Sequence, residues 1–282
     1  MPAPLVTGYR LPQSLEGTIL EEIVETKLRE VAGAKQRLPA ESMEHWLARA
    51  PEVRSLKAAL LRKAPAVIAE IKKASPSAGI LRPDFDPAAL AAEYQRGGAA
   101  ALSVLTEAQH FQGSLEILAD LRWRCRLPLL RKDFILESYQ LVESRYAGAD
   151  AVLVIAALHP GPRLEELRRR GEELGMEVLV EVHDEAELER ALAGGATLVG
   201  VNSRDLRTFE VSLDVCFRLA TRIPKGIVAV AESGIRNATD LQRLQEAGFR
   251  GFLIGEQLMR AASPGTALAA LRAHARVGGK VA

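Results

Sequence analysis

The sequence predicts an α/β protein that folds as a single (β/α)8 TIM barrel with an N-terminal helical extension. Short apolar, β-prone runs alternate with amphipathic helical stretches from Val67 to the C-terminus, which is the pattern of repeated βα units. Roughly eight such units occur, and this number suits closure into a barrel. The 282 residues, of which 48% are apolar, are enough to bury one large core.

Two segments precede the first predicted strand. Residues 1–17 contain three prolines and two glycines and are expected to form a flexible arm. Residues 18–62 show helical periodicity, as at Ile19 and Ile23, with no intervening strand. Because they are too few for an independent domain, we expect them to pack on the barrel as a helical extension that covers its lower end. The barrel is then expected to comprise residues 63–282.

Eight segments are predicted as barrel strands because apolar runs in them are bounded by turn signals. They are 67–72, 101–106, 129–133, 151–156, 177–182, 198–202, 227–232 and 251–254. Helix starts lie between them: Asp86 precedes Pro87 as a candidate N-cap, and Asp184 with Glu187 makes a start similar to a capping box. The alternative fold is an open doubly wound sheet, which is built from the same βα units. We rank this fold second, because the number of units suits closure into a barrel and no GxGxxG motif follows the first strand.

Composition limits the range of partners. The formal net charge is +1, so no global field attracts nucleic acid or an anionic membrane. No apolar run has the length of a membrane span and the N-terminus lacks the order of a signal peptide, so we expect a cytoplasmic protein. The sequence leaves open whether it is a monomer or a small homo-oligomer.

Several residues with reactive or aromatic side chains are interpreted as structural. Cys125 and Cys216 lack the spacing of a disulfide framework or a metal site and are expected to pack in the interior. Trp46 and Trp123 lie on helical stretches and are also expected to pack. His183, two residues after Glu181, could approach the site, but we expect it rather to orient a loop. The histidines show no metal-ligand spacing. No metal is implied.

Polar residues stand at the ends of the predicted strands, where the active site of a (β/α)8 barrel lies. Glu70 and Lys72 are two apart and therefore project from the same face of their strand. The later strands contribute Lys132, Glu181, Asn202, Arg204, Glu232 and Ser233. Solvated strand caps or rim ion pairs are the alternative interpretation. Repeated convergence of carboxylates and basic groups favours a catalytic pocket, because buried charges are costly unless paired.

Glycines follow the last two predicted strands, in Ser233-Gly234 and Gly255-Glu256. Glycine lets backbone N–H groups approach an anion at a helix start, and a phosphate usually lies there in such barrels. Each dipeptide alone is also ordinary turn chemistry. Their positions after consecutive final strands favour a phosphate site.

Seven motifs resemble those of the indole-3-glycerol phosphate synthase family. In chain order they are VIAEIKKASPSAG, LSVLTE with FQGS, LLRKDFI, VEVHDE, GVNSRDL, AESGI and FLIGEQLM. The resemblance implies a carboxy-lyase of tryptophan biosynthesis that needs no cofactor. Its substrate would be 1-(2-carboxyphenylamino)-1-deoxyribulose 5-phosphate, which is converted to indole-3-glycerol phosphate by ring closure with loss of carbon dioxide and water.

The resemblance also implies roles for individual residues. Lys132 would be the general acid that protonates the ketone oxygen, Glu181 the catalytic carboxylate, and Glu70 with Lys72 the pair for dehydration, with the division of the last proton transfers left open. The positions that would contact the ligand are Asn202, Arg204, Glu232, Ser233 and Gly234. The phosphate would lie at Ser233, Gly234, Gly255 and the backbone N–H of Glu256, a position where some members of the family carry Ser. The apolar residues that would clamp the anthranilate ring are Pro76, Phe111, Phe134, Leu153 and Leu206.

Two other functions are considered. One is another phosphosugar barrel enzyme, either an isomerase or an aldolase that forms a Schiff base at Lys132. The other is a non-catalytic barrel scaffold, which would not need Lys132, Glu181 and Glu70 together.

Overall fold

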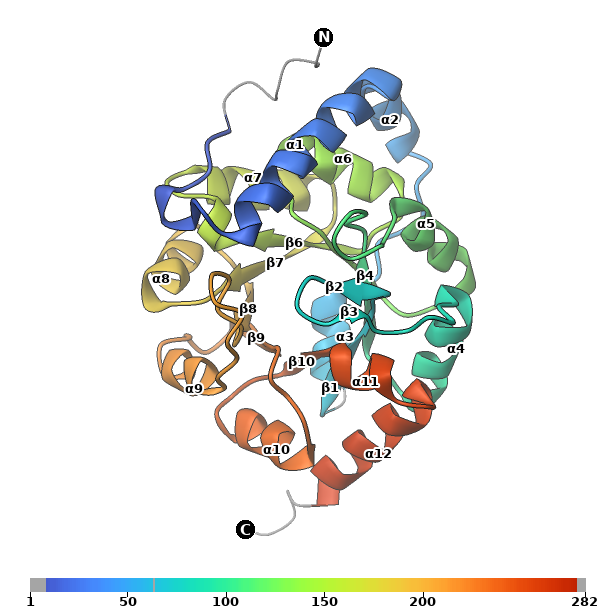
Figure 1. Cartoon of the computed structure of the whole chain (residues 1–282), viewed down its shortest axis with the longest axis vertical. Helices are drawn as coiled ribbons and strands as arrows, with labels where there is room; N and C mark the ends of the chain where they lie inside the picture. Colours follow the sequence, from blue (N-terminus) through green and yellow to red (C-terminus); the bar gives the residue numbers. More distant parts are fainter. Residues whose placement is uncertain (1–8, 63, 278–282) are drawn as a thin grey trace.

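The chain folds into a closed barrel of eight parallel strands (Figure 1). The computed structural model describes residues 9–62 and 64–277. The strand order is β1-β10-β9-β8-β7-β6-β5-β4. β1 (Ala66–Ile71) closes the ring because it pairs with both β10 (Gly251–Ile254) and β4 (Ala101–Leu105). The predicted (β/α)8 barrel is therefore confirmed, and the open sheet is excluded.

The other barrel strands lie within one residue of their predicted bounds, and helices surround them in Figure 1. These strands are β5 (Leu129–Lys132), β6 (Ala151–Ile155), β7 (Glu177–Val182), β8 (Leu198–Asn202) and β9 (Val228–Glu232). A separate two-stranded sheet of β2 (Ala74–Ser75) and β3 (Gly79–Ile80) follows β1. The helices after β1 are α4 (Pro87–Gly97), α5 (Leu115–Arg124), α6 (Ser138–Tyr146), α7 (Arg163–Glu173), α8 (Glu185–Ala193), α9 (Asp214–Ala220), α10 (Ala238–Glu246), α11 (Glu256–Arg260) and α12 (Pro264–Val277). No helix in the described residues is long and apolar enough to cross a membrane.

Side-chain alternation divides each strand between two apolar layers. Residues such as Ile68, Leu130 and Leu179 point inward and fill the barrel, whereas Val67 and Val180 point outward against the helices. Both faces of each strand are thus buried. This explains why the sequence of each strand is a nearly continuous run of apolar residues. A polar side chain at an inward position near a strand end is therefore held inside the barrel.

The predicted helix starts are present. The Asp86 carboxylate accepts hydrogen bonds from the backbone N–H groups of Ala88 and Ala89, with Pro87 as the first helical residue of α4. The Asp184 carboxylate accepts one from the N–H of Glu187 at the start of α8. These caps satisfy N–H groups that have no partner within the helix.

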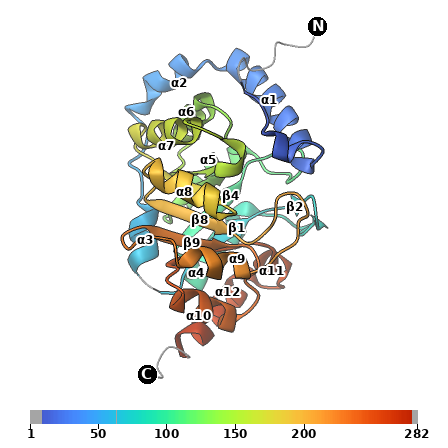
Figure 2. The same ribbon diagram turned by 90° about the vertical axis from the view of Figure 1, so that its left-hand side faces the viewer.

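The N-terminal helices reach both ends of the barrel (Figure 2). α3 (Leu56–Arg62) lies at the lower end, where a Cβ on Gly251 would be 3.1 Å from Leu60. α1 (Ile19–Arg37) lies at the opposite end, and its Leu20 lines the cavity described below. α2 (Ala40–Leu47) packs against α6. The expectation of a lower cover is thus wrong for α1, because an apolar stripe shows that a helix is buried but not on which surface.

Part of the predicted N-terminal arm is visible. Residues 1–8 lie outside the described residues. Tyr9 donates a hydrogen bond from its hydroxyl to the carbonyl of Leu158, in the 3-10 turn η2 (Ala156–Leu158). Leu15, in the 3-10 turn η1 (Gln13–Leu15), is buried in the same apolar cluster as Leu20. Residues 9–15 therefore contact the barrel through both polar and apolar groups.

The cysteines are buried as predicted, whereas the tryptophans are not. Cys125 and Cys216 are buried free cysteines, as expected. The expectation for the tryptophans is wrong, because the side chains of Trp46 and Trp123 are 50% and 79% exposed. Their helices each have a solvent face, and both indoles lie on it.

Candidate active site

A cavity of about 400 Å³ opens at the C-terminal ends of the barrel strands. Every site residue predicted from the sequence lines it: Glu70, Lys72, Pro76, Phe111, Lys132, Phe134, Leu153, Glu181, Asn202, Arg204, Leu206, Glu232, Ser233, Gly234, Gly255 and Glu256. These residues come from β1 through α11, so barrel closure brings them together. The volume is in the range of small-molecule sites.

Two lysine–carboxylate groups lie in the cavity. Lys132, at the end of β5, places its Nζ 3.0 Å from Oε2 of Glu181 and 3.4 Å from Oε2 of Glu232. The Nζ of Lys72 lies 2.6 Å from Oε1 of Glu70. The carboxylates of Glu70, Glu181 and Glu232 are all buried. The site thus holds two separate ion pairs capable of exchanging protons with a ligand.

Glu181 is held by neighbours on the far side from Lys132. The side-chain amide of Asn202 donates a hydrogen bond to its Oε1 at 3.1 Å, and Nε2 of His183 lies 3.2 Å from the same oxygen. Nδ1 of His183 lies 3.0 Å from Glu187, which also accepts a hydrogen bond from the His183 backbone N–H. His183 therefore contacts the candidate catalytic carboxylate as well as ordering the start of α8, so the approach to the site that the sequence analysis ranked second is present.

The charges in this cluster set one another's protonation. Burial alone would lower the pKa of Lys132, but the carboxylates of Glu181, Glu232 and Glu70 outweigh it and raise that pKa. Burial would raise the pKa of Glu181, but Lys132 and His183 lower it below its usual range. Burial likewise opposes protonation of His183, yet Glu181 and Glu187 raise its pKa to about 10. At neutral pH Lys132 and His183 are therefore cationic and Glu181 is anionic.

Glu232 differs from Glu181 although both touch Lys132. Burial raises the pKa of Glu232 to about 8, and the negative charges of Glu181 and Glu70 add to this increase against the opposing effect of Lys132. Neither of its oxygens has a hydrogen-bond partner among the described residues. A single lysine cannot compensate all of the carboxylates around it, so Glu232 is the one that retains its proton.

This difference predicts the pH dependence of stability. In the unfolded chain Glu232 loses its proton near its ordinary pKa of 4.5, whereas in the folded protein it does so near 8. Its stabilising contribution is therefore full below pH 4.5 and is lost as the pH rises to about 8. We expect the free energy of unfolding of wild type, relative to Glu232→Gln, to fall on the order of 1–3 kcal/mol across this window. Urea titrations at several pH values measure it.

A matched control uses Glu246→Gln, because Glu246 is exposed on α10. Its difference from wild type should remain nearly constant over the same pH range. A constant or rising difference for Glu232→Gln would contradict the assignment of the retained proton to Glu232.

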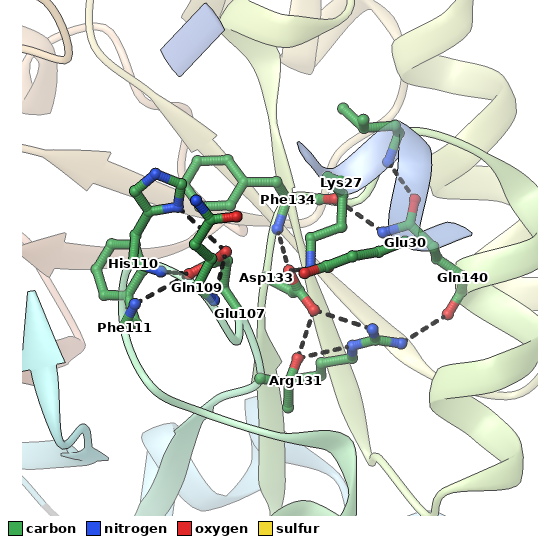
Figure 3. Close-up of polar contacts among 12 residues, drawn as sticks. Lys27, Glu30, Glu107, Gln109, His110, Phe111, Arg131, Asp133, Phe134 and Gln140 are labelled. Atoms are coloured by element: carbon green, nitrogen blue, oxygen red, sulfur yellow. Dashed lines mark hydrogen bonds and ion pairs between the residues drawn. The ribbon is translucent and has the colours of Figure 1, made fainter. Parts of the chain in front are cut away.

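Aromatic side chains form an apolar wall of the cavity. The rings of Phe111 and Phe134 lie with their centroids 6.2 Å apart. Phe111 is held by the fully buried carboxylate of Glu107, which accepts hydrogen bonds from the backbone N–H groups of Gln109, His110 and Phe111 (Figure 3). The loop after β4 therefore has a fixed shape, and its aromatic ring faces Phe134.

A second buried cluster ties α1 to the end of β5 (Figure 3). Asp133 pairs with Lys27 of α1 at 3.0 Å and with Arg131 at 2.9 Å. Burial would raise the pKa of Asp133, but Lys27 and Arg131 lower it below its usual range. The sequence analysis missed this cluster. Its signal was Lys27 standing in the apolar stripe of α1, four residues after Ile23 and four before Val31.

The loops after β8 and β9 form the far end of the cavity. Ser233 and Gly234 have φ angles of 65° and 76°, in the left-handed region that is unfavourable for serine. Such strain at a cavity wall indicates a functional constraint. Arg204 points toward Glu256, with Nη2 3.8 Å from Oε2. Further lining residues that the sequence analysis did not assign to the site include Ile23, Phe209, Arg236, Gln257 and Arg260.

This fold and cavity define a (β/α)8-barrel enzyme that acts on a small molecule, because acid–base side chains and apolar walls converge where barrel enzymes carry their active sites. The family model of indole-3-glycerol phosphate synthase matches residues 20–271. The chain belongs to the indole-3-glycerol phosphate synthase family, and the predicted family resemblance is confirmed.

Two curated members of this family align with the chain over nearly their whole length. The chain is 49% identical over 258 residues to the indole-3-glycerol phosphate synthase of Laribacter hongkongensis, an alignment that covers 90% of this chain and 98% of that protein. It is also 49% identical over 257 residues to the indole-3-glycerol phosphate synthase of Polaromonas naphthalenivorans, with the same coverage.

More distant solved structures share the fold. KGPDC from Streptococcus mutans superposes with a TM-score of 0.59 at 13% identity, covering 76% of this chain and 99% of that one. Thiamine phosphate pyrophosphorylase from Pyrococcus furiosus gives 0.56 at 17% identity, covering 79% and 98%. At such identities the likeness shows the barrel fold alone.

Proposed function

We propose that this protein catalyses the indole-3-glycerol phosphate synthase reaction, with Lys132 as the principal acid. The observation that carries the proposal is the Lys132 ammonium, 3.0 Å from Glu181 and 3.4 Å from Glu232 in the cavity. Ring closure needs a proton donor beside a ketone oxygen, and the surrounding carboxylates keep this lysine protonated.

The cavity supports one orientation of 1-(2-carboxyphenylamino)-1-deoxyribulose 5-phosphate. Phe111 and Phe134 form an apolar wall suited to the anthranilate ring. The phosphate would lie at Ser233, Gly234 and Gly255, which line the cavity beside a turn with positive φ angles, a backbone conformation that can direct N–H groups at an anion. This leaves the ketone in the charged zone between them, near Lys132.

Three chemical events follow from this placement. The ring carbon that bears the carboxylate attacks the ketone carbon, and Lys132 protonates the oxygen as its carbonyl π bond breaks. The carboxylate then leaves as carbon dioxide, and its bonding electrons restore the aromatic ring. Finally the new hydroxyl leaves as water while a base removes a proton from the adjacent carbon, which forms the pyrrole double bond. Each proton transfer needs a group within hydrogen-bond reach.

The second ion pair is suited to the dehydration. Lys72 and Glu70 lie 2.6 Å apart on the same wall, so one can donate a proton to the leaving hydroxyl while a carboxylate accepts another. Glu181 is anionic and held by Asn202, which suits it to stabilise positive charge on the ring nitrogen and to act as a base. We propose that Glu181 and the Glu70–Lys72 pair share these later transfers.

The assignment is tested by adding the carboxyphenylamino substrate to the purified protein and following indole fluorescence. Product formation without added metal or cofactor is expected, and no product from wild type would end the proposal. Borohydride trapping examines the aldolase alternative, because reduction of a Schiff base would leave the substrate covalently attached to Lys132. We expect no such adduct.

We further propose that the enzyme works in the cytoplasm as a monomer or small homo-oligomer. Residues 18–62 would form its helical extension and residues 63–282 its catalytic barrel. The contacts of α1 and α3 with opposite ends of the barrel support this division.

A further inference from the structure

An inward position of β8 lacks a side chain next to the charged cluster. Leu198 and Asn202 of this strand point into the barrel, and Gly200 between them shares that face. Its register partners on the adjacent strands are Glu181 of β7 and Val230 of β9. Gly200 therefore leaves a gap inside the barrel at the level of the candidate catalytic groups.

The gap is filled by the carboxylate of Glu232. A Cβ placed on Gly200 would lie 2.0 Å from Oε1 of Glu232 and 3.1 Å from its Cδ, while Leu179 would be at an ordinary 3.4 Å. The backbone itself does not demand glycine, because Gly200 lies within a regular strand and outside the left-handed region. The requirement for glycine at this position is thus steric, and Glu232 imposes it.

Few other interactions hold Glu232 in place. Apart from the Lys132 ammonium at 3.4 Å, neither oxygen has a polar partner among the described residues. Its location is consequently set by the shape of the space around it. Gly255, which directly follows β10, has the same relation to Glu70 of β1, since a Cβ on Gly255 would lie 2.1 Å from Oε1 of Glu70.

We propose that Gly200 is a positioning residue of this active site, whose missing Cβ forms the slot that holds the Glu232 carboxylate beside Lys132. The inference rests on the proposed function and adds a determinant of its geometry. An added methyl group would expel the carboxylate from the slot, because the free end of a glutamate moves more easily than a barrel strand.

Gly200→Ala tests the slot. We expect kcat to fall by about 10- to 100-fold, with KM changed less than about threefold, because expulsion of the Glu232 group 3.4 Å from Lys132 disturbs the position of the proposed acid, and small displacements in an active site have effects of this size. Unchanged kcat in a folded Gly200→Ala variant would overturn the inference. Wild type is assayed first, so that absence of product there counts against the proposed function and not against the slot.

Shortening Glu232 provides the decisive comparison. Aspartate withdraws the carboxylate by about 1.5 Å, so it no longer needs the slot. Adding Gly200→Ala to Glu232→Asp should then lower kcat by less than about threefold relative to Glu232→Asp alone. Equal losses in both backgrounds would show that Gly200 does not act through Glu232. If Gly200→Ala alone fails to fold, we expect the Gly200→Ala/Glu232→Asp double variant to fold, because the shorter side chain leaves room for the added methyl group. If neither variant folds, the inference is overturned.

A control separates the slot from general overpacking. Gly171 of α7 lies in the outer apolar layer, where a Cβ would be 2.6 Å from Val178. Gly171→Ala should lower the melting temperature but leave kcat and KM near wild type. If the two alanine variants gave the same kinetic profile, the loss at Gly200 would have to be attributed to packing.

Discussion

Lys132→Ala is expected to abolish nearly all turnover while the barrel remains folded. General acid catalysis contributes about 10²- to 10⁴-fold, and Lys132 is the ammonium closest to Glu181, so we expect kcat to fall by about 10³-fold. The apolar walls and the phosphate end of the cavity are unchanged in this variant, so the Kd of a substrate analogue should change little. Indole fluorescence measures the rate, and circular dichroism verifies the fold.

Lys225→Ala is the matched control, because Lys225 is exposed on the segment between α9 and β9. Its kcat should equal that of wild type. Near-normal turnover by a folded Lys132→Ala protein would show that another group protonates the ketone oxygen, and the acid would then have to be reassigned.

Glu181→Gln is expected to produce the second largest loss, about 10²- to 10³-fold in kcat. The amide preserves the size of the side chain but removes the negative charge that pairs with Lys132 and His183. Glu181 is also the strongest of the carboxylates that raise the pKa of Lys132. Its neutralisation should therefore lower that pKa, so that the activity remaining in the variant declines at a lower alkaline pH than in wild type.

The pH–rate profile of the variant measures this shift. Glu189→Gln is a suitable control because the Glu189 side chain is 71% exposed on α8 and, within the described part of the chain, forms only a surface ion pair at 3.5 Å with Arg222. It should leave both rate and profile unchanged. A Glu181→Gln enzyme whose profile coincided with wild type would contradict the electrostatic role assigned to Glu181.

Strand positions and cavity residues could be predicted because one pattern specifies both. In a closed parallel barrel each strand is apolar on both faces, so Lys132 or Glu181 at the end of an apolar run stands out in the sequence. Alternation then assigns these residues to the interior, and barrel closure brings them to one end. The cavity contains each of them for this reason.

Long-range contacts of the N-terminal helices could not be predicted in the same way. The apolar stripe of α1 indicated burial, but no local feature specified that Ile23 would line the cavity or that Lys27 would pair with Asp133. Periodicity describes one helix face, whereas the partner of that face depends on the loops and the shape of the barrel end. For the same reason the helical periodicity did not reveal that Trp123 would lie on a solvent-exposed face.

The sequence by itself determined the barrel, its strand phase, the family and the residues that face the cavity, because these depend on alternation and on short motifs. Only the tertiary structure decided how the charged groups differ from one another. Glu181 and Glu232 are the same residue type at equivalent strand ends, yet the pKa of one is lowered and that of the other is raised. Electrostatic energies depend on distance and burial, and the separation of Glu232 from Lys132, Glu181 and Gly200 exists only once the barrel has closed.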